Sequence, residues 1–308
     1  MTIGLELLLA NIAEGALHDA AERGNQPGCH ENTRVAILKE IMDWLQDPKA
    51  REKFIYWLYG PAGSGKTSIA QSIAEALAKF GLLAASFFFW RSATGRNTSD
   101  RFTATIAYQL SRSIPTMADP LYTTIERDPI IFSKSLAIQL QALIIDPLQA
   151  ALQCAPPHET PERIIIIVDG LDECSPTKSQ VELLGLLRTA VQEFRSIPFL
   201  CLVSSRPEYE IRSAFADSNP LGALTATLAL GDNYRTNQDI KLYLVSKFNE
   251  FRDEHLQLGS KLPSPWPADH DVDCIVRKAS GQFIFAVTAI KFIDDPRGDP
   301  VERLSIIL

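Results

Sequence analysis

The sequence predicts an α/β fold in which helices cover both faces of a parallel β-sheet. Between residues 31 and 231, apolar strand-like runs alternate with segments of helical periodicity, as in a doubly wound domain. Residues 163–168 contain a run of β-branched side chains without polar alternation, which is typical of a strand buried on both faces. A glycine-rich motif at residues 60–67 joins the first strand of this sheet to a helix, where such sheets bind phosphate groups.

The elements of this domain follow one another with short connections. Thr33 is expected to cap a helix that reaches about Gln46, because apolar residues recur there at helical spacing. Polar residues 91–101 are expected to form a loop. The predicted strands are residues 54–59, 82–90, 163–168, 199–204 and 224–230. The further predicted helices are residues 68–80, 102–113, 135–153 and 178–194.

The chain divides into three predicted parts. Residues 1–30 are expected to form a lead-in segment, and residues 31–231 to form the α/β core. Residues 232–308 are expected to form a small helical subdomain beside the sheet. Its predicted helices are residues 236–251, 269–279 and 282–294, with a proline-rich stretch at residues 262–267.

Composition excludes several classes of protein. The net charge of −7 and the pI of about 5.3 argue against nucleic acid as a partner, because no basic face is implied. No run of about 18 apolar residues is present, so no membrane span is expected. The five cysteines are odd in number and include no C-x-x-C pair, which indicates reduced thiols in a cytoplasmic protein.

The motif from Gly60 to Thr67 fits the G-x-x-x-x-G-K-[ST] pattern of a phosphate-binding loop. Its glycines at 60, 63 and 65 can take positive φ, so the loop can turn its N–H groups inward around a polyphosphate. Lys66 is expected to reach the β- and γ-phosphates, and the Thr67 hydroxyl to ligate Mg²⁺. These motifs contact no base, so ATP and GTP both stay open. The predicted nucleotide-binding residues are Gly60, Pro61, Ala62, Gly63, Ser64, Gly65, Lys66, Thr67 and Ser68.

Two further strands end in residues that suit a nucleoside triphosphatase. Asp169 ends the strand at 163–168 and is expected to hold Mg²⁺, while Asp172 and Glu173 could orient or deprotonate the attacking water. Arg206 follows the strand at 199–204 and could contact the γ-phosphate. The plainer interpretations are a solvated acidic turn and an ion pair between Arg206 and a surface acid such as Glu208. Ligands of open α/β sheets bind at the carboxyl ends of the strands, so Lys66, Asp169 and Arg206 are expected at one edge.

The motifs GPAGSGKTS, IIIIVDGLDE and CLVSSRP, in this order, resemble those of the NACHT family of STAND nucleotide-binding proteins. Within this family, the chain more closely resembles the NACHT domains of fungal NOD-like (NLR-type) proteins. The resemblance extends to the segments NTRVAILKEIMDWLQD, FFFWRSATGRNTSDRFTATIAYQL and ASGQFIFAVTAIKFIDDPRGDPVERL. Gly170, Asp172 and Glu173 match the small residue and the two acids that follow the magnesium aspartate in that family.

The resemblance implies an AAA+/STAND-like P-loop NTPase fold, a five-stranded parallel core with a C-terminal helical lid. It implies a slow, nucleotide-driven switch, closed with diphosphate and opened by triphosphate, which then forms a homo-oligomer or joins another NACHT protein. Fungal innate-immunity or incompatibility-type signalling would be the setting. Family members add effector, winged-helix and repeat domains, and this sequence ends at Leu308, about where a winged helix would start. A truncated member is therefore expected.

Two other functions stay open at this point. One is a phosphotransferase that passes the γ-phosphoryl group to a small acceptor, although no acceptor pocket can be recognised in the sequence. The other is an interaction module that holds nucleotide without hydrolysing it. Glu173, as the expected general base, distinguishes a hydrolase from such a module.

Overall fold

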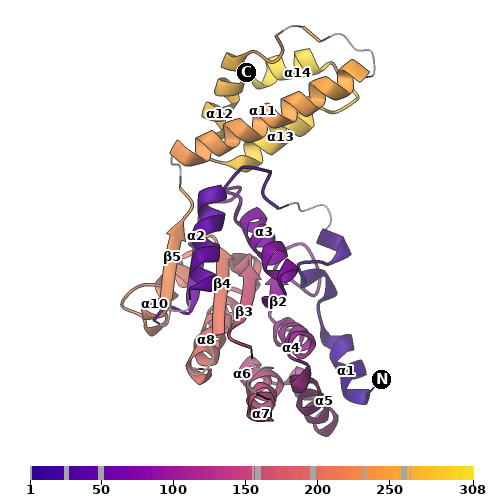
Figure 1. Cartoon of the computed structure of the whole chain (residues 1–308), viewed down its shortest axis with the longest axis vertical. Helices are drawn as coiled ribbons and strands as arrows, with labels where there is room; N and C mark the ends of the chain where they lie inside the picture. Colours follow the sequence, from indigo (N-terminus) through magenta and orange to yellow (C-terminus); the bar gives the residue numbers. More distant parts are fainter. Residues whose placement is uncertain are drawn as a thin grey trace.

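A computed structural model describes residues 2–23, 28–47, 52–154, 156, 161–194, 199–231, 234–257, 262–263 and 265–308. Its centre is a five-stranded sheet with the order β2-β3-β4-β1-β5, in which all neighbouring strands are parallel. The strands are β1 (Ile55–Tyr59), β2 (Leu83–Phe88), β3 (Ile164–Asp169), β4 (Phe199–Ser205) and β5 (Thr225–Ala229). This architecture confirms the predicted α/β class and all five predicted strands (Figure 1).

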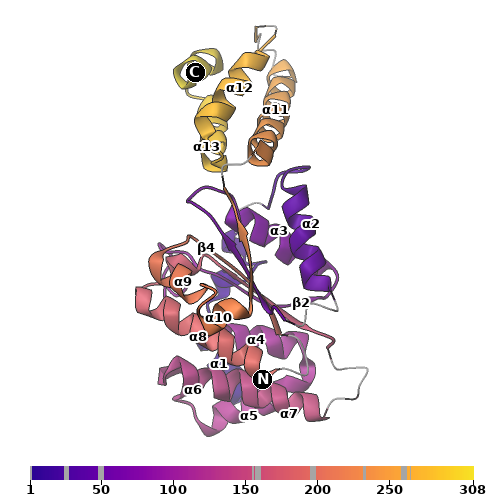
Figure 2. The same ribbon diagram turned by 90° about the vertical axis from the view of Figure 1, so that its left-hand side faces the viewer.

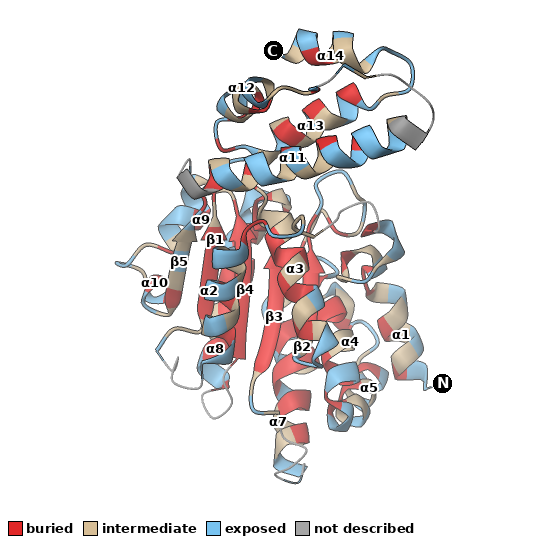
Figure 3. Ribbon diagram, turned by 45° about the horizontal axis from the view of Figure 1, so that its top comes forward, coloured by how far each residue is buried: buried red, intermediate tan, exposed pale blue. Residues whose placement is uncertain are grey.

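Helices cover the sheet on both faces (Figure 2). One face packs against α2 (Val35–Gln46) and α3 (Lys66–Lys79) through a core that includes Ile41, Ile69 and Ile73. Because both faces are covered, every residue of β3 and β4 is buried (Figure 3), as their uninterrupted apolar sequences predicted. A second apolar core contains residues of the strands and of seven further helices. These helices are α4 (Phe102–Ser113), α5 (Ala118–Arg127), α6 (Leu136–Leu140), α7 (Asp146–Cys154), α8 (Thr177–Glu193), α9 (Tyr209–Ala214) and α10 (Pro220–Ala223).

Four helices form a lid above the carboxyl ends of the strands (Figure 1). They are α11 (Tyr234–Gln257), α12 (Asp269–Ala279), α13 (Phe283–Ile293) and α14 (Pro300–Ile307), and they enclose a separate apolar core. The first three confirm predicted helices, whereas α14 was not predicted. Apart from the gaps given above, no helix combines the length and apolar character needed to cross a membrane.

The segment before β1 differs from the prediction in two ways. Thr33 does not cap α2, because its hydroxyl donates to the carbonyl of His30 (2.6 Å). Arg34 occupies the N-cap position instead, in the left-handed conformation with φ 58°. Residues expected as lead-in also include α1 (Ile3–Asn11), whose Leu8 is fully buried in the same core as α5.

One predicted helix is interrupted. The segment expected at 135–153 consists of α6 and α7 joined by a π-helical turn, Gln141–Ile145. The division between core and lid predicted at 231/232 adjoins residues 232–233, which lie outside the described residues. Short 3-10 turns complete the chain at Glu14–Ala16, Ala21–Arg23, Pro115–Met117, Ile131–Ser133 and Leu171–Glu173.

Candidate functional site

The predicted site residues lie after three strands that are neighbours in the sheet. The strand β4 lies between β1 and β3, so the segments after all three strands meet at the carboxyl edge. The loop at 60–65 follows β1, Asp169 ends β3, and Arg206 follows β4. The sheet therefore brings together the three motifs that are far apart in the sequence.

Lys66 lies over the loop that precedes it. Its Nζ donates to the carbonyls of Gly60 (2.9 Å) and Pro61 (2.8 Å), which leaves one ammonium N–H for another acceptor. Burial lowers the pKa of Lys66, and the nearby carboxylates of Asp172 and Asp169 oppose this shift. A positive charge is thus held, partly desolvated, at the N-terminus of α3.

Two more carbonyls of the loop are bonded from outside it. The carbonyl of Gly63 accepts from the Ile284 N–H of the lid (3.3 Å), and the carbonyl of Ser64 accepts from the Arg34 guanidinium (2.9 Å). With the carbonyls held by these donors, the N–H groups are the free side of the loop. Within the described part of the chain, no protein acceptor is bonded to the backbone N–H groups of Gly63, Gly65, Lys66 and Thr67. Such a set of free donors at a helix N-terminus is suited to a polyphosphate.

The three glycines of the loop have two different roles. Gly63 and Gly65 have positive φ (73° and 90°), as predicted. Gly60 does not, so that part of the prediction was wrong. Glycine is needed there because a Cβ atom would lie 2.6 Å from the carbonyl oxygen of Leu230.

Gly60→Ala is therefore expected to lower the free energy of unfolding by about 1–3 kcal/mol, the usual cost of an overpacked site. Urea denaturation would measure it. Gly185→Ala is the matched control, because a Cβ atom there meets nothing within 4 Å in the middle of α8. This control should raise stability by about 0.5–1 kcal/mol. Equal effects of both changes would contradict the close approach at Gly60.

Asp169 lies at the end of β3 and is 2% exposed. Its carboxylate accepts hydrogen bonds from the hydroxyls of Ser204 and Thr67. Burial raises the pKa of Asp169, and these two hydrogen bonds oppose the shift. The carboxylate and the Thr67 hydroxyl form an oxygen-only donor pair beside the loop, which fits the preference of Mg²⁺ for oxygen ligands.

The two acids beyond Asp169 have different partners. Asp172 is 3% exposed, and both its oxygens are bonded to Arg206, through the backbone N–H (2.8 Å) and through Nε (3.2 Å). Glu173 is half-buried, and its Oε2 accepts from the backbone N–H of Arg91 (2.9 Å). The ion pair of Arg206 is thus with Asp172, inside the site, and not with Glu208.

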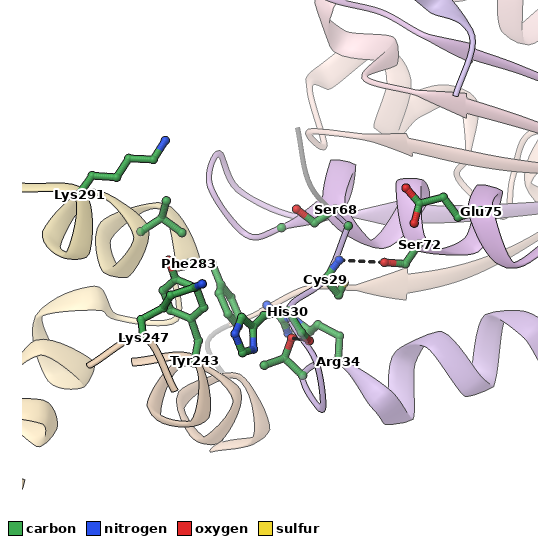
Figure 4. Close-up of a pocket in the computed structure, with 14 residues that line it drawn as sticks. Cys29, His30, Arg34, Ser68, Ser72, Glu75, Tyr243, Lys247, Phe283 and Lys291 are labelled. Atoms are coloured by element: carbon green, nitrogen blue, oxygen red, sulfur yellow. Dashed lines mark hydrogen bonds between the residues drawn. The ribbon is translucent and has the colours of Figure 1, made fainter. Parts of the chain in front are cut away.

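A cavity of about 450 Å³ opens from the loop toward the lid. Gly65 and Ser68 line its loop end, and residues 28–30 and 33–34 line one side (Figure 4). Tyr243 and Phe283 of the lid face these residues across the cavity. The backbone N–H of Cys29 donates to Ser72 Oγ (2.8 Å), which fixes the segment at 28–34 against α3.

Sequence reasoning missed the lid side of this cavity. The residues concerned are Tyr243, Lys247, Phe283, Val287 and Lys291. No local pattern marks them, because they become neighbours of the loop only when the lid packs over the strand ends. The contacts of Arg34 were not predicted for a related reason, since a plain helix cap was the preferred interpretation of its segment.

Comparison with known proteins agrees with this fold. Residues 33–206 match the family model described as Nephrocystin 3, N-terminal, which is more than half of the chain. Among solved structures, the ORC2 protein of Aeropyrum pernix, in ADPNP and ADP complexes, is similar with a TM-score of 0.55 and 16% identity. That match covers 92% of this chain and 70% of the other. A Walker-type ATPase of Pyrococcus abyssi has a TM-score of 0.52 and 13% identity, covering 92% and 73%. No curated protein matches significantly.

Proposed function

This chain belongs to the Nephrocystin 3, N-terminal family, and we propose that it binds a nucleoside triphosphate with Mg²⁺ and hydrolyses it slowly. The observation that carries the proposal is the loop at 60–65. Donors of the protein hold the carbonyls of Gly60, Pro61, Gly63 and Ser64. By contrast, four N–H groups just before and at the start of α3 have no protein acceptor in the described chain. Backbone of this kind suits a chain of phosphates better than any neutral ligand.

The cavity beside the loop has the size and lining for the nucleoside part. A volume of about 450 Å³ lies within the usual range of small-molecule sites. Tyr243 and Phe283 supply aromatic surface that can pack against a base, and Ser68 and Ser72 supply hydroxyls near the loop. Either ATP or GTP would fit this description.

The residues around the loop have different roles in the proposed hydrolysis. Thr67 and Asp169 would hold Mg²⁺, which when bound neutralises charge on the β- and γ-phosphates. Glu173 is the better general base, because one of its carboxylate oxygens is free of the hydrogen bond to Arg91. Asp172 has both oxygens bonded to Arg206, so its role is to hold that guanidinium beside the site.

The finer proposal is a NACHT/STAND-type regulatory switch, with a core at 31–231, a lid at 232–308 and a lead-in at 1–30. Its support is that the lid bonds directly to the phosphate loop, from the Ile284 N–H to the Gly63 carbonyl. A ligand that alters the conformation of the loop can therefore alter the position of the lid relative to the sheet. Nucleotide-dependent homo-oligomerisation in the cytoplasm belongs to the same proposal.

The test is to purify the chain, release any bound nucleotide with acid and identify it by chromatography. Steady-state hydrolysis with Mg²⁺ is then measured on the same sample. Tightly held diphosphate with slow turnover is the expected result, and it would also identify the base. Fast turnover stimulated by a small acceptor would instead indicate a phosphotransferase. Binding without turnover would indicate a module that only holds nucleotide, and absence of both would refute the proposal.

A further inference from the structure

Arg34 connects three parts of the molecule that are distant in sequence. Its side chain is 4% exposed, although arginine is seldom buried without a partner. One guanidinium nitrogen donates to the carbonyl of Ser64 in the phosphate loop (2.9 Å). Another donates to Thr236 Oγ1 of α11 (3.0 Å), and Nε lies 4.0 Å from the Asp239 carboxylate.

The bond to Ser64 has a direct consequence for the loop. The peptide group between Ser64 and Gly65 is planar, so its carbonyl and its N–H point in opposite directions. When Arg34 holds the carbonyl on the outer side, the Gly65 N–H is directed to the other side of that peptide. The Gly65 N–H is one of the four donors without a protein acceptor in the described part of the chain. Arg34 therefore determines which face of this peptide a phosphate meets.

The other contacts of Arg34 belong to the lid. Its guanidinium lies over the ring of Phe283, at 4.8 Å from the centroid, at the start of α13. The neighbouring residue of α13, Ile284, bonds the Gly63 carbonyl. The lid is thus connected to two successive peptide groups of the loop. It bonds the Gly63 carbonyl through its own backbone, and it contacts Arg34, which bonds the Ser64 carbonyl.

The chemistry of arginine is needed for this arrangement. Burial lowers the pKa of Arg34 and the Asp239 carboxylate opposes the shift, so a charge is kept in a largely dry place. The planar guanidinium presents donors in fixed, diverging directions, which allows it to bond the loop and α11 together. A lysine has a single nitrogen on a flexible stem and cannot reproduce that geometry.

We propose that Arg34 is a positioning residue for the phosphate loop, which orients the Ser64–Gly65 peptide and couples this orientation to the lid. The inference rests on the proposed function, because it assigns the loop to phosphate binding. It does not require Arg34 to touch the nucleotide. The effect of Arg34 is therefore exerted on the phosphates, through the loop, and not on the base.

The test compares two ligands by isothermal titration, inorganic tripolyphosphate and the nucleoside triphosphate that binds the wild type, each with Mg²⁺. Tripolyphosphate has no base or ribose and can report only on the phosphate end. Arg34→Lys and Arg34→Ala should weaken both ligands by a similar factor, about 10- to 100-fold, as expected for the loss of hydrogen bonds from a charged group. Arg163→Ala is the matched control, because Arg163 also donates to a backbone carbonyl, that of Leu45, away from the site.

Thr236→Val provides a second variant that keeps Arg34 and removes its bond to α11, together with the bond from the Thr236 hydroxyl to the Gly231 carbonyl (3.3 Å). It should weaken both ligands about 3- to 10-fold, less than the loss of Arg34 itself, because the bond from Arg34 to the Ser64 carbonyl is kept. In the protein without added ligand, it should also speed amide hydrogen exchange at 63–67 and 283–287 together. Loss of nucleotide affinity with unchanged tripolyphosphate affinity would overturn the inference, since Arg34 would then act on the base. Unchanged affinity for both ligands would overturn it too, and a wild type that binds neither would refute the proposed function as well.

Discussion

Lys66→Ala is expected to weaken binding of the nucleoside triphosphate by about 10²-fold or more. The ammonium has one N–H left after its bonds to the carbonyls of Gly60 and Pro61, and a phosphate oxygen is its natural acceptor. Isothermal titration with the triphosphate and Mg²⁺ measures the loss. Unchanged affinity would contradict the assignment of the loop.

The same variant should keep its fold. It loses two hydrogen bonds, but it also removes a partly desolvated positive charge from the N-terminus of α3, where the helix dipole disfavours cations. These effects oppose each other, so the melting temperature without ligand should change little, while the rise that ligand causes should disappear. Lys79→Ala, at the exposed end of the same helix, is the control and should leave both quantities unchanged.

Much of the fold could be predicted because the information is local. The strands at 163–168 and 199–204 are recognisable since burial on both faces permits unbroken apolar runs. The phosphate loop is recognisable because its backbone needs glycine at 63 and 65, where φ is positive. The order of the strands was not evident from any one segment, yet the rule that ligands meet strand ends in open sheets was enough to place the motifs together.

The partners of charged side chains could not be predicted. The plainer interpretation paired Arg206 with a surface acid such as Glu208, whereas its ion pair is with Asp172, 34 positions earlier in the chain. That pair depends on β3 and β4 lying side by side in register, which is a property of the whole sheet. For Arg34 the distance is greater still, because Thr236 is 202 positions away. Contacts between residues so far apart in the sequence cannot be predicted from the spacing of residues in a motif.

The general base is tested by Glu173→Gln, which should bind the triphosphate with wild-type affinity and hydrolyse it more slowly, by about 10²-fold or more. The amide keeps a carbonyl oxygen that can accept from the Arg91 N–H, so the local structure should persist. It cannot accept a proton from water, so the loss falls on the chemical step. Single-turnover hydrolysis, with affinity titrated separately, measures the two quantities.

Asp172→Asn distinguishes the two acids. Both oxygens of Asp172 bond Arg206, so an amide there would place an N–H group against a donor and leave a buried site partly unpaired. Affinity and turnover should then fall together, because the guanidinium loses its position. Wild-type turnover in Glu173→Gln would transfer the role of base to Asp172 or to the bound substrate. If Glu173→Gln loses turnover and keeps its affinity, Glu173 acts in proton transfer. If Asp172→Asn loses both affinity and turnover, Asp172 acts by positioning Arg206.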